Sequence, residues 1–365
     1  MITMLVMAGL LITVAVVLLV AERILISYGE CSVTVNDKQC IEVEGGETLL
    51  SVLSRHKLFI PSACGGKATC GFCKVVVKGG AGTILPTEEI FINKAEREQG
   101  MRLACQVRIE RPVQVRVPES MLGAREFLSE VLAVEQLTYD TRLIRFGLTG
   151  SDEVRFKPGQ YIQLLVPGTD QFRAYSVASA PSRTRELELI IRHVPGGLCT
   201  GWIHGAIEKG DKVRFTGPFG DFYLREDSNR EIVAIGGGSG MAPMRSIIMH
   251  LAEQGMPRRI TLFFGARRRR DLFFVEEFRA LERRFPNFRY MPALSEPRPE
   301  DNWTGETGFI TQVVVRHVSP VSHPSHSSAS DREAVLCGPP PMIDAAMRVL
   351  PPLGISADHT YFDKF

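Results

Sequence analysis

Residues 64–73 read C-G-G-K-A-T-C-G-F-C, and the later segment R-L-A-C-Q-V at 102–107 contains one more cysteine. A [2Fe–2S] cluster is held by four thiolates, commonly three from one loop with the spacing C-x4-C-x2-C and one from a distant segment. Here five residues separate the first two cysteines. Glycines in the loop let the backbone fold around the inorganic core and direct N–H groups at its sulfurs. The pattern therefore predicts a [2Fe–2S] cluster held by Cys64, Cys70, Cys73 and Cys105.

Four cysteines could also hold a structural zinc ion or form two disulfides. Zinc ribbons usually pair two C-x2-C knuckles, and this chain has one, from Cys70 to Cys73. Disulfides need an oxidising compartment, whereas scattered cysteines are typical of a reducing cytosol. The remaining cysteines are scattered in this way: Cys31, Cys40, Cys199 and Cys337. The iron–sulfur interpretation fits the spacing best.

The composition indicates two or three globular domains of ordinary size. The chain has 365 residues, of which 44% are hydrophobic, and a formal net charge of +2 from 43 basic and 41 acidic side chains. This balance gives no reason to expect nucleic-acid binding.

The first 21 residues contain no charged side chain and are almost wholly apolar. About 20 such residues are enough to cross a bilayer. A cleavable signal peptide would normally begin with basic residues, and a buried core helix would keep a polar side for solvent. We therefore predict a retained single-pass anchor in residues 1–27, in the membrane through residues 3–21. Arg23 favours the cytoplasmic side for the rest of the chain.

Three modules are predicted after the anchor, so the fold class is multidomain. Residues 28–121 combine an expected hairpin, a short helix, the cysteine loop and a further strand, the order of a plant-type α+β (β-grasp) ferredoxin. Residues 122–226 show short strands between regularly spaced turns, which favours an antiparallel β-barrel that binds FAD. Residues 227–365 alternate strands with helices, as in an α/β parallel-sheet domain that binds NAD(H). Within it, residues 317–331, rich in Ser, His and Pro, predict an exposed loop.

A flavin site is predicted around Arg173-Ala-Tyr-Ser176. A guanidinium matches a pyrophosphate, a tyrosine ring can lie flat against a flavin, and a serine hydroxyl can hydrogen-bond a ring nitrogen. The segment Gly196–Thr200 then opens a helix expected over 201–207, whose free N–H groups suit a phosphate. The same residues could instead be an edge-strand arginine and a core tyrosine.

A nicotinamide site is predicted where two strands end. Gly236–Pro243 follows one expected strand and precedes a helix, and Cys337-Gly-Pro-Pro340 follows another. Two such loops at one edge of a parallel sheet make a crevice where dinucleotides bind. We interpret Cys337 as a positioning residue near the nicotinamide and not as a nucleophile.

Two further segments leave alternatives open. The run Arg267–Arg270 follows the second strand of this sheet and could accept a 2′-phosphate, so NADPH stays possible beside NADH. The chain ends Tyr-Phe-Asp-Lys-Phe at 361–365, and the terminal ring could cover the flavin or dock on the core.

With these motifs in view, the chain resembles the F subunit of the sodium-translocating NADH:quinone oxidoreductase over nearly its whole length. The resemblance rests on the five-residue gap between Cys64 and Cys70 and on five segments: 84–88, 102–107, 173–176, 236–245 and 299–305. The chain departs from that family between the strand at 159–162 and the R-x-Y-S strand, where the family usually carries a long insertion and this chain has a short connection, 164–172.

The resemblance implies site residues for each cofactor. Phe365 would stack on the flavin, and together with Ser176 and Cys337 it forms the expected catalytic set. FAD would be held by Arg173, Tyr175, Ser176, Gly197, Leu198, Cys199, Thr200 and Phe365. NADH, favoured over NADPH, would be held by Gly236, Gly237, Gly238, Ser239, Gly240, Cys337, Gly338 and Pro339.

The expected function is that of a membrane-anchored NADH dehydrogenase module. Electrons would pass from NADH to FAD, to the [2Fe–2S] cluster and then to a membrane acceptor such as a quinone, on the cytoplasmic side of the cytoplasmic membrane. The expected partners are NADH and the membrane redox subunits of a multi-subunit complex. The short connection at 164–172 is more typical of soluble reductases that serve oxygenases, which is the first alternative. A tethered electron carrier without turnover is the second.

Overall fold

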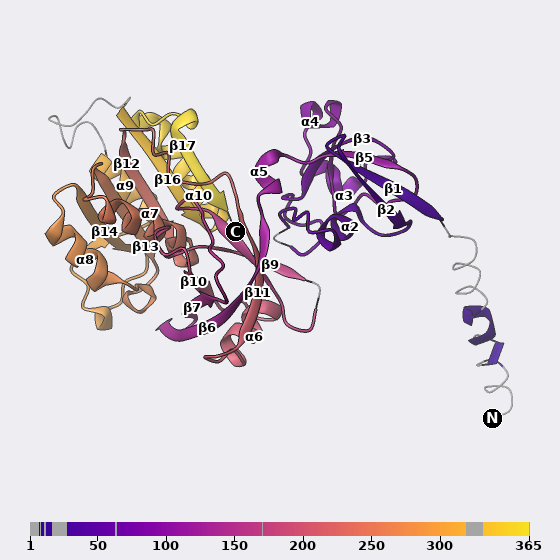
Figure 1. Cartoon of the computed structure of the whole chain (residues 1–365). Coiled ribbons are helices and arrows are strands. Elements are labelled where there is room, and N and C mark those ends of the chain that lie inside the picture. Colours follow the sequence, from indigo (N-terminus) through magenta and orange to yellow (C-terminus); the bar gives the residue numbers. More distant parts are fainter. Residues whose placement is uncertain are drawn as a thin grey trace. The chain divides into compact units, whose positions relative to one another are not determined.

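The computed structural model describes residues 7, 9, 10, 12–16, 28–62, 64–169, 171–318 and 331–364 (Figure 1). These residues belong to two compact units, Met1–Gly123 and Ala124–Phe365. Residues 12–16 are helical, but no helix of the described part is long and apolar enough to cross a membrane. Much of the predicted anchor, and residues 319–330 of the predicted exposed loop, lie outside the described residues.

The first unit is built on a five-stranded sheet with the order β2-β1-β5-β3-β4. Strand β1 pairs in parallel with β5, and the other pairs are antiparallel. The strands are β1 (Glu30–Val35), β2 (Gln39–Glu44), β3 (Lys74–Gly79), β4 (Met101–Leu103) and β5 (Val113–Arg116). The predicted hairpin is confirmed, because Asn36 and Asp37 join β1 to β2 with φ of 52° and 58°. Asn and Asp tolerate this left-handed conformation better than most residues.

Short helices complete this unit. Helix α2 (Leu49–Arg55) begins where the Thr48 side chain accepts a hydrogen bond from the Ser51 N–H, and it buries Leu49, Val52 and Leu53 against the sheet. The remaining helices are α3 (Pro86–Glu89), α4 (Lys94–Glu98) and α5 (Glu119–Leu122). The core that α2 completes also includes Cys73 and Cys105, so two of the predicted cluster ligands are part of the hydrophobic interior.

The second unit begins with a six-stranded antiparallel sheet of order β10-β7-β6-β11-β8-β9. Its strands are β6 (Arg125–Thr138), β7 (Thr141–Leu148), β8 (Tyr161–Leu165), β9 (Phe172–Ser176), β10 (Glu186–Arg192) and β11 (Lys212–Phe219). A bridge from Val177 to Leu189 joins the end of β9 to β10, so the two edges of the sheet meet. This confirms the predicted antiparallel barrel.

A parallel sheet of order β15-β14-β13-β12-β16-β17 follows, as predicted. Its strands are β12 (Glu231–Gly237), β13 (Ile260–Ala266), β14 (Phe288–Leu294), β15 (Glu306–Thr307), β16 (Arg332–Gly338) and β17 (Thr360–Lys364). Ile232 and Ala234 face a core with helices α7 (Met241–Glu253) and α8 (Val275–Arg284). Because side chains alternate along a strand, Val233 and Ile235 face a second core with α9 (Ile310–Val318) and α10 (Pro340–Val349).

The barrel and the parallel sheet share one of these cores. Leu143, Ala178 and Ile190 of the barrel half belong to the same buried cluster as Met241 and Met244 of α7. The two halves of this unit are therefore packed against each other by apolar contact, which gives their relative position a physical basis.

A buried ion pair stabilises the first unit beside its cysteines. The Glu88 side chain is fully buried and accepts hydrogen bonds from Arg102 at 2.6 and 2.9 Å. It also accepts the N–H groups of Leu85 and Leu103, at 3.0 and 2.9 Å. One carboxylate thus connects the start of α3 to β4, two residues before Cys105.

We predict that Glu88→Ala destabilises this unit by about 3 kcal/mol or more, because it leaves a buried guanidinium without its partner. Hydrogen exchange measured by mass spectrometry over residues 28–121 reports on this unit separately from the rest. The matched control is Glu89→Ala, since Glu89 forms an ion pair with Arg97 in which both side chains are about half exposed. That change should cost about 0.5 kcal/mol or less. Equal effects of the two variants would contradict the prediction.

Candidate redox cofactor sites

The cysteine loop adopts a backbone conformation that suits glycine. Gly65, Gly66 and Gly71 have φ of 64°, 85° and 70°, and Ala68 also lies in the left-handed region at 56°. A Cβ added at Gly71 would lie 2.6 Å from the Phe91 ring, so this position has no room for a side chain. The loop is therefore held in a tight left-handed path by sequence and by packing.

The four predicted ligand thiols form two pairs. The Sγ atoms of Cys64 and Cys70 are 3.4 Å apart, and Cys73 and Cys105 hydrogen-bond each other. The hydrogen bond from Cys70 lowers the pKa of Cys64 to about 4, and the one from Cys73 lowers the pKa of Cys105 to about 7. The same hydrogen bonds raise the pKa of Cys70 and Cys73. Each pair therefore favours one thiolate, the form that binds metal.

Backbone N–H groups of the loop also reach these sulfurs. Thr69 and Lys67 hydrogen-bond the Cys64 sulfur, Phe72 bonds that of Cys70, and Ala68 bonds that of Cys105. Such bonds stabilise negative charge on sulfur and are one way in which a protein adjusts the potential of a cluster. This agrees with the expectation that the loop directs N–H groups at the core.

The arrangement fits a two-iron cluster, in which each iron takes two thiolates from the protein. Within the described ranges, no three His, Cys, Asp or Glu side chains are grouped to hold a single ion. Cys73 and Cys105 are 1% and 4% exposed, whereas Cys64 and Cys70 are half-buried. One pair is thus part of the core and the other lies nearer to solvent.

The predicted flavin residues lie on β9 and at the start of helix α6 (Leu198–Gly205). Tyr175 and Arg173 pair across the sheet with Ile162 and Leu164, whereas Ser176 pairs with Tyr161 on the opposite face. The Tyr175 side chain hydrogen-bonds that of Cys199, and burial raises the pKa of both groups. The barrel therefore brings the R-x-Y-S strand and the Gly197–Thr200 turn together.

Helix α6 begins three residues earlier than expected. Gly197 is its N-cap and no side chain caps it, so N–H groups of the first turn have no side-chain partner. A Cβ at Gly197 would lie 2.5 Å from Thr200 Oγ1 and 3.0 Å from the Val194 carbonyl oxygen. The close turn needs glycine, and the helix can begin as soon as Gly197 has passed. The predicted start at residue 201 was therefore wrong.

The two predicted nicotinamide loops meet at the carboxyl edge of the parallel sheet. Gly236 at the end of β12 pairs with Cys337 on β16. A Cβ at Gly240 would collide with the Cys337 carbonyl oxygen, and one at Gly338 would lie 3.3 Å from the Gly237 carbonyl oxygen. The glycines thus allow two backbones to approach closely, as expected for a crevice at this edge. Gly238, Ser239 and Gly240 form a short 3-10 turn before α7.

Cys337 and the C-terminal strand are neighbours. Cys337 is fully buried, and burial together with Asp363 raises its pKa well above the ordinary value of 9.0. A neutral thiol is a poor nucleophile, which agrees with the predicted positioning role. Asp363 pairs with Cys337 from β17, and burial raises its pKa to about 6. Phe365, the predicted flavin-stacking ring, lies outside the described residues.

Asp363 is not among the site residues predicted from sequence. An acidic residue close to the end of the chain is a weak signal by itself, and only the parallel pairing of β16 and β17 places it beside Cys337.

The arginine run after β13 is partly engaged within the protein. Arg268 lies within 2.7 Å of Glu300 and 3.3 Å of Asp301, and Arg269 donates to the Asp301 carbonyl at 3.1 Å. Two carboxylates beside Arg268 reduce its ability to attract a 2′-phosphate. This contact favours NADH over NADPH.

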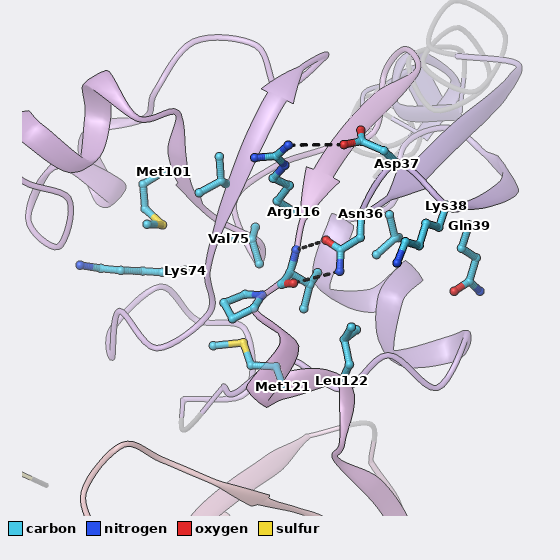
Figure 2. A pocket seen from close by; sticks show the side chains of 14 residues that line it. Asn36, Asp37, Lys38, Gln39, Lys74, Val75, Met101, Arg116, Met121 and Leu122 are labelled. Carbon is cyan, nitrogen blue, oxygen red and sulfur yellow. Dashed lines mark hydrogen bonds and ion pairs between the residues drawn. The ribbon is translucent and has the colours of Figure 1, made fainter.

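A groove of about 730 Å³ lies in the first unit, away from these motifs (Figure 2). Its main polar side chains have partners in the protein. Asn36 bonds the backbone of Val117, Asp37 pairs with Arg116 and Lys78, and Lys74 pairs with Glu96 (Figure 2). Because these groups are satisfied, we assign the groove no ligand.

Three family models match the chain in order. Residues 33–110 match a 2Fe-2S iron-sulfur cluster binding domain, residues 129–223 an oxidoreductase FAD-binding domain, and residues 234–348 an oxidoreductase NAD-binding domain. The F subunit of the Na(+)-translocating NADH-quinone reductase of Neisseria gonorrhoeae is 35% identical, with 98% of this chain and 96% of the relative covered. The protein of the same name in Serratia proteamaculans is 34% identical, with 98% and 97% covered.

This chain belongs to the family of F subunits of the Na(+)-translocating NADH-quinone reductases. The resemblance inferred from the motifs is therefore confirmed, and so are a multidomain oxidoreductase fold and the predicted cofactors [2Fe–2S], FAD and NADH. The alignment with the Neisseria relative extends over 398 residues, more than the 365 of this chain, so the relative has residues without a counterpart here. The residues that contact each cofactor stay predictions.

Solved structures show the same architecture. The cytochrome P450 reductase GcoB of Amycolatopsis is 33% identical, with a TM-score of 0.72 over 92% of this chain and 98% of that one. The ferredoxin reductase in carbazole 1,9a-dioxygenase is 24% identical with a TM-score of 0.70 over 92% of this chain and 98% of that one, and it supports the fold.

We predict that Asp363→Asn raises the thermal unfolding midpoint, and by a larger margin at pH 8 than at pH 5. The raised pKa means that the neutral carboxyl is favoured in the folded state; its stabilising effect is complete below pH 3.8 and is lost as the pH rises through about 6. Above that pH the native chain carries a buried charge that the variant lacks. The control is Asp344→Asn, whose exposed side chain pairs with Lys364. An equal margin at both pH values for Asp363→Asn would contradict the prediction.

Proposed function

We propose that this chain oxidises NADH and passes the electrons through FAD and a [2Fe–2S] cluster to an acceptor in the membrane. The observation that carries this proposal is the presence of all three cofactor domains in one chain, in the order found in a 35% identical relative covered over 98% of this chain. When bound, the flavin accepts a hydride and releases electrons singly, which joins a two-electron donor to a one-electron carrier.

The residues of the chain then bind and orient these groups. Arg173 and the uncapped start of α6 supply positive charge and N–H donors for the FAD pyrophosphate. Ser176 would donate its hydroxyl to the flavin ring, and Tyr175 would pack beside it. The Gly236–Gly240 loop would hold the NADH phosphates, with Cys337 and the Gly338–Pro339 backbone beside the nicotinamide. Phe365 would cover the flavin until NADH enters.

We assign the modules as residues 28–121 for the cluster, 122–226 for FAD and 227–365 for NADH. The four cysteines of the paired thiols would hold the cluster. Residues 1–27 would anchor the chain in the cytoplasmic membrane, with the redox domains on the cytoplasmic side and other redox subunits as partners. The uncharged first 21 residues and the family's membrane-linked electron acceptor support this part.

A reductase for a soluble oxygenase is the second candidate. The connection between β8 and β9 is short, from Val166 to Gln171, and GcoB, a cytochrome P450 reductase, is 33% identical. Steady-state assays separate the two: NADH oxidation coupled to a short-chain quinone in reconstituted membranes supports the first, and coupling only to a soluble haem protein supports the second. A chain that does not reduce ferricyanide with NADH would instead be a carrier without turnover.

We predict that NADH bleaches the bound flavin of the purified, cluster-loaded full chain within a single turnover, followed by loss of the visible bands of the oxidised cluster. Stopped-flow absorbance measures both steps. A flavin that stays oxidised under saturating NADH would end the proposal.

The matched variant is Cys70→Ser. It removes one thiolate from the pair with Cys64, and we expect the cluster bands to disappear while NADH still reduces the flavin at about the native rate. Loss of both signals would contradict two separable sites.

We predict that the full chain sediments with membranes and is released by detergent but not by high salt, because burial of about 20 apolar residues is insensitive to ionic strength. The control is the same chain beginning at residue 28, which should stay in the supernatant. Release of the full chain by salt alone would contradict an anchor.

A further inference from the structure

A single arginine joins the barrel to the parallel sheet. Arg245 lies on α7, five residues after Gly240, and its side chain is only 10% exposed. Its Nη1 donates to Glu188 Oε2 at 2.6 Å and to the Ala178 carbonyl at 3.2 Å. Its Nε and Nη2 donate to the two oxygens of Glu277 on α8, at 2.8 and 3.0 Å. One guanidinium therefore bonds a barrel strand, the segment after β9 and a helix of the other half.

Glu188 is the barrel side of this contact. It lies on β10 with 3% of its side chain exposed, and its other oxygen accepts Arg145 Nε at 3.0 Å. Burial opposes ionisation of Glu188, but the charges and hydrogen bonds of Arg245 and Arg145 outweigh it and lower its pKa. The carboxylate is thus charged and held by arginines from both halves. Removal of either partner from such a buried pair leaves an uncompensated charge.

A second contact lies beside the first. Ser246 Oγ donates to the Ser179 carbonyl at 2.7 Å, and the Ala178 N–H donates to the Glu188 carbonyl at 2.7 Å. Ala178 and Ser179 come two and three residues after Ser176. The segment that directly continues the predicted flavin strand is therefore bound on one side by β10 and on the other by α7.

These bonds lie close to both predicted cofactor sites along the chain. On the flavin side they begin two residues from Ser176, and on the NADH side they begin five residues from Gly240. Hydride transfer needs donor and acceptor atoms about 3–3.5 Å apart, and a misplacement of about 1 Å can cost about 100-fold in rate. A fixed connection between these two segments is what such a distance requires.

We propose that the clamp formed by Arg245, Glu188 and Glu277 positions the nicotinamide-binding loop against the flavin-binding strand and so sets the rate of hydride transfer. Its members are positioning residues, because their polar groups are engaged by one another and by the backbone. The inference rests on the proposed NADH oxidation and adds the element that aligns its two cofactors.

The test is Glu188→Gln in the FAD- and cluster-loaded full chain, by single-turnover flavin reduction. We expect the rate at saturating NADH to fall about 10- to 100-fold. FAD content should stay native, and the apparent Kd for NADH should change by less than about threefold. The deuterium isotope effect, measured with NADH deuterated at its reactive carbon, should become larger, because a longer transfer distance makes the chemical step more limiting. A merely structural role would lower FAD content without changing the isotope effect.

The matched control is Glu333→Gln. Glu333 is 1% exposed and forms an ion pair with Arg258 at 2.7 Å, but at the beginning of β16, the opposite edge of the sheet from the glycine loops. Its rate should stay within about twofold of the native chain, because the pair does not join the predicted flavin strand to α7. An equal loss in both variants would overturn the clamp.

Ser246→Ala provides a milder cut if Glu188→Gln folds poorly. It removes one hydrogen bond between α7 and Ser179, and we expect a fall of about threefold in the same rate, with a larger isotope effect. A native rate and isotope effect in a fully flavinated Glu188→Gln or Ser246→Ala variant overturns the clamp alone. A native chain whose flavin is not reduced by NADH overturns the proposed function and the clamp together.

Discussion

A carboxylate buried between arginines is the interaction on which the arrangement of this protein depends most. Glu188, 3% exposed, lies where a barrel strand meets the first helix after the glycine loop, and Arg245 reaches it from that helix. The desolvation of two charges is costly, so the pair does not necessarily add stability over an apolar contact. What it adds is direction, because a guanidinium has a fixed set of donors and accepts few alternative geometries. The apolar core shared by the two halves gives the contact, and the ion pair selects one alignment within it.

The first unit uses the same device on a smaller scale. Glu88, fully buried, binds Arg102 and two backbone N–H groups, and so holds the strand that leads to Cys105 against helix α3. Two of the four thiols then belong to the core, and the other two lie on a loop of left-handed residues. A metal site built half in the interior and half on a glycine loop combines rigid ligands with access for electrons. The lowered pKa of one thiol in each pair agrees with such a site.

The dinucleotide edge depends on the absence of side chains. Gly240 and Gly338 lie where any Cβ would meet the backbone of the neighbouring loop, so the strand ends of β12 and β16 come within contact of each other. The N–H groups of α7 then lie beside a buried, neutral Cys337 and beside Asp363. This edge is therefore shaped for a ligand that approaches the backbone closely, and the surrounding groups are tuned mainly by burial.

Local sequence determined the cysteine ligand pattern, the hairpin at Asn36-Asp37, the antiparallel barrel and the parallel sheet, because spacing, turn residues and hydrophobic periodicity act over a few residues. It also placed Gly236 and Cys337 at strand ends, which a parallel sheet must bring to one edge. The start of α6 at Leu198 was missed by three residues, since a helix boundary depends on how closely Gly197 can turn against Thr200 and Val194. Only the tertiary structure decided that Asp363 lies beside Cys337 and that Glu188 meets Arg245, 57 residues further along the chain. Such partners are chosen by strand register and by the packing of one half against the other, and neither leaves a mark in the residues adjacent to them.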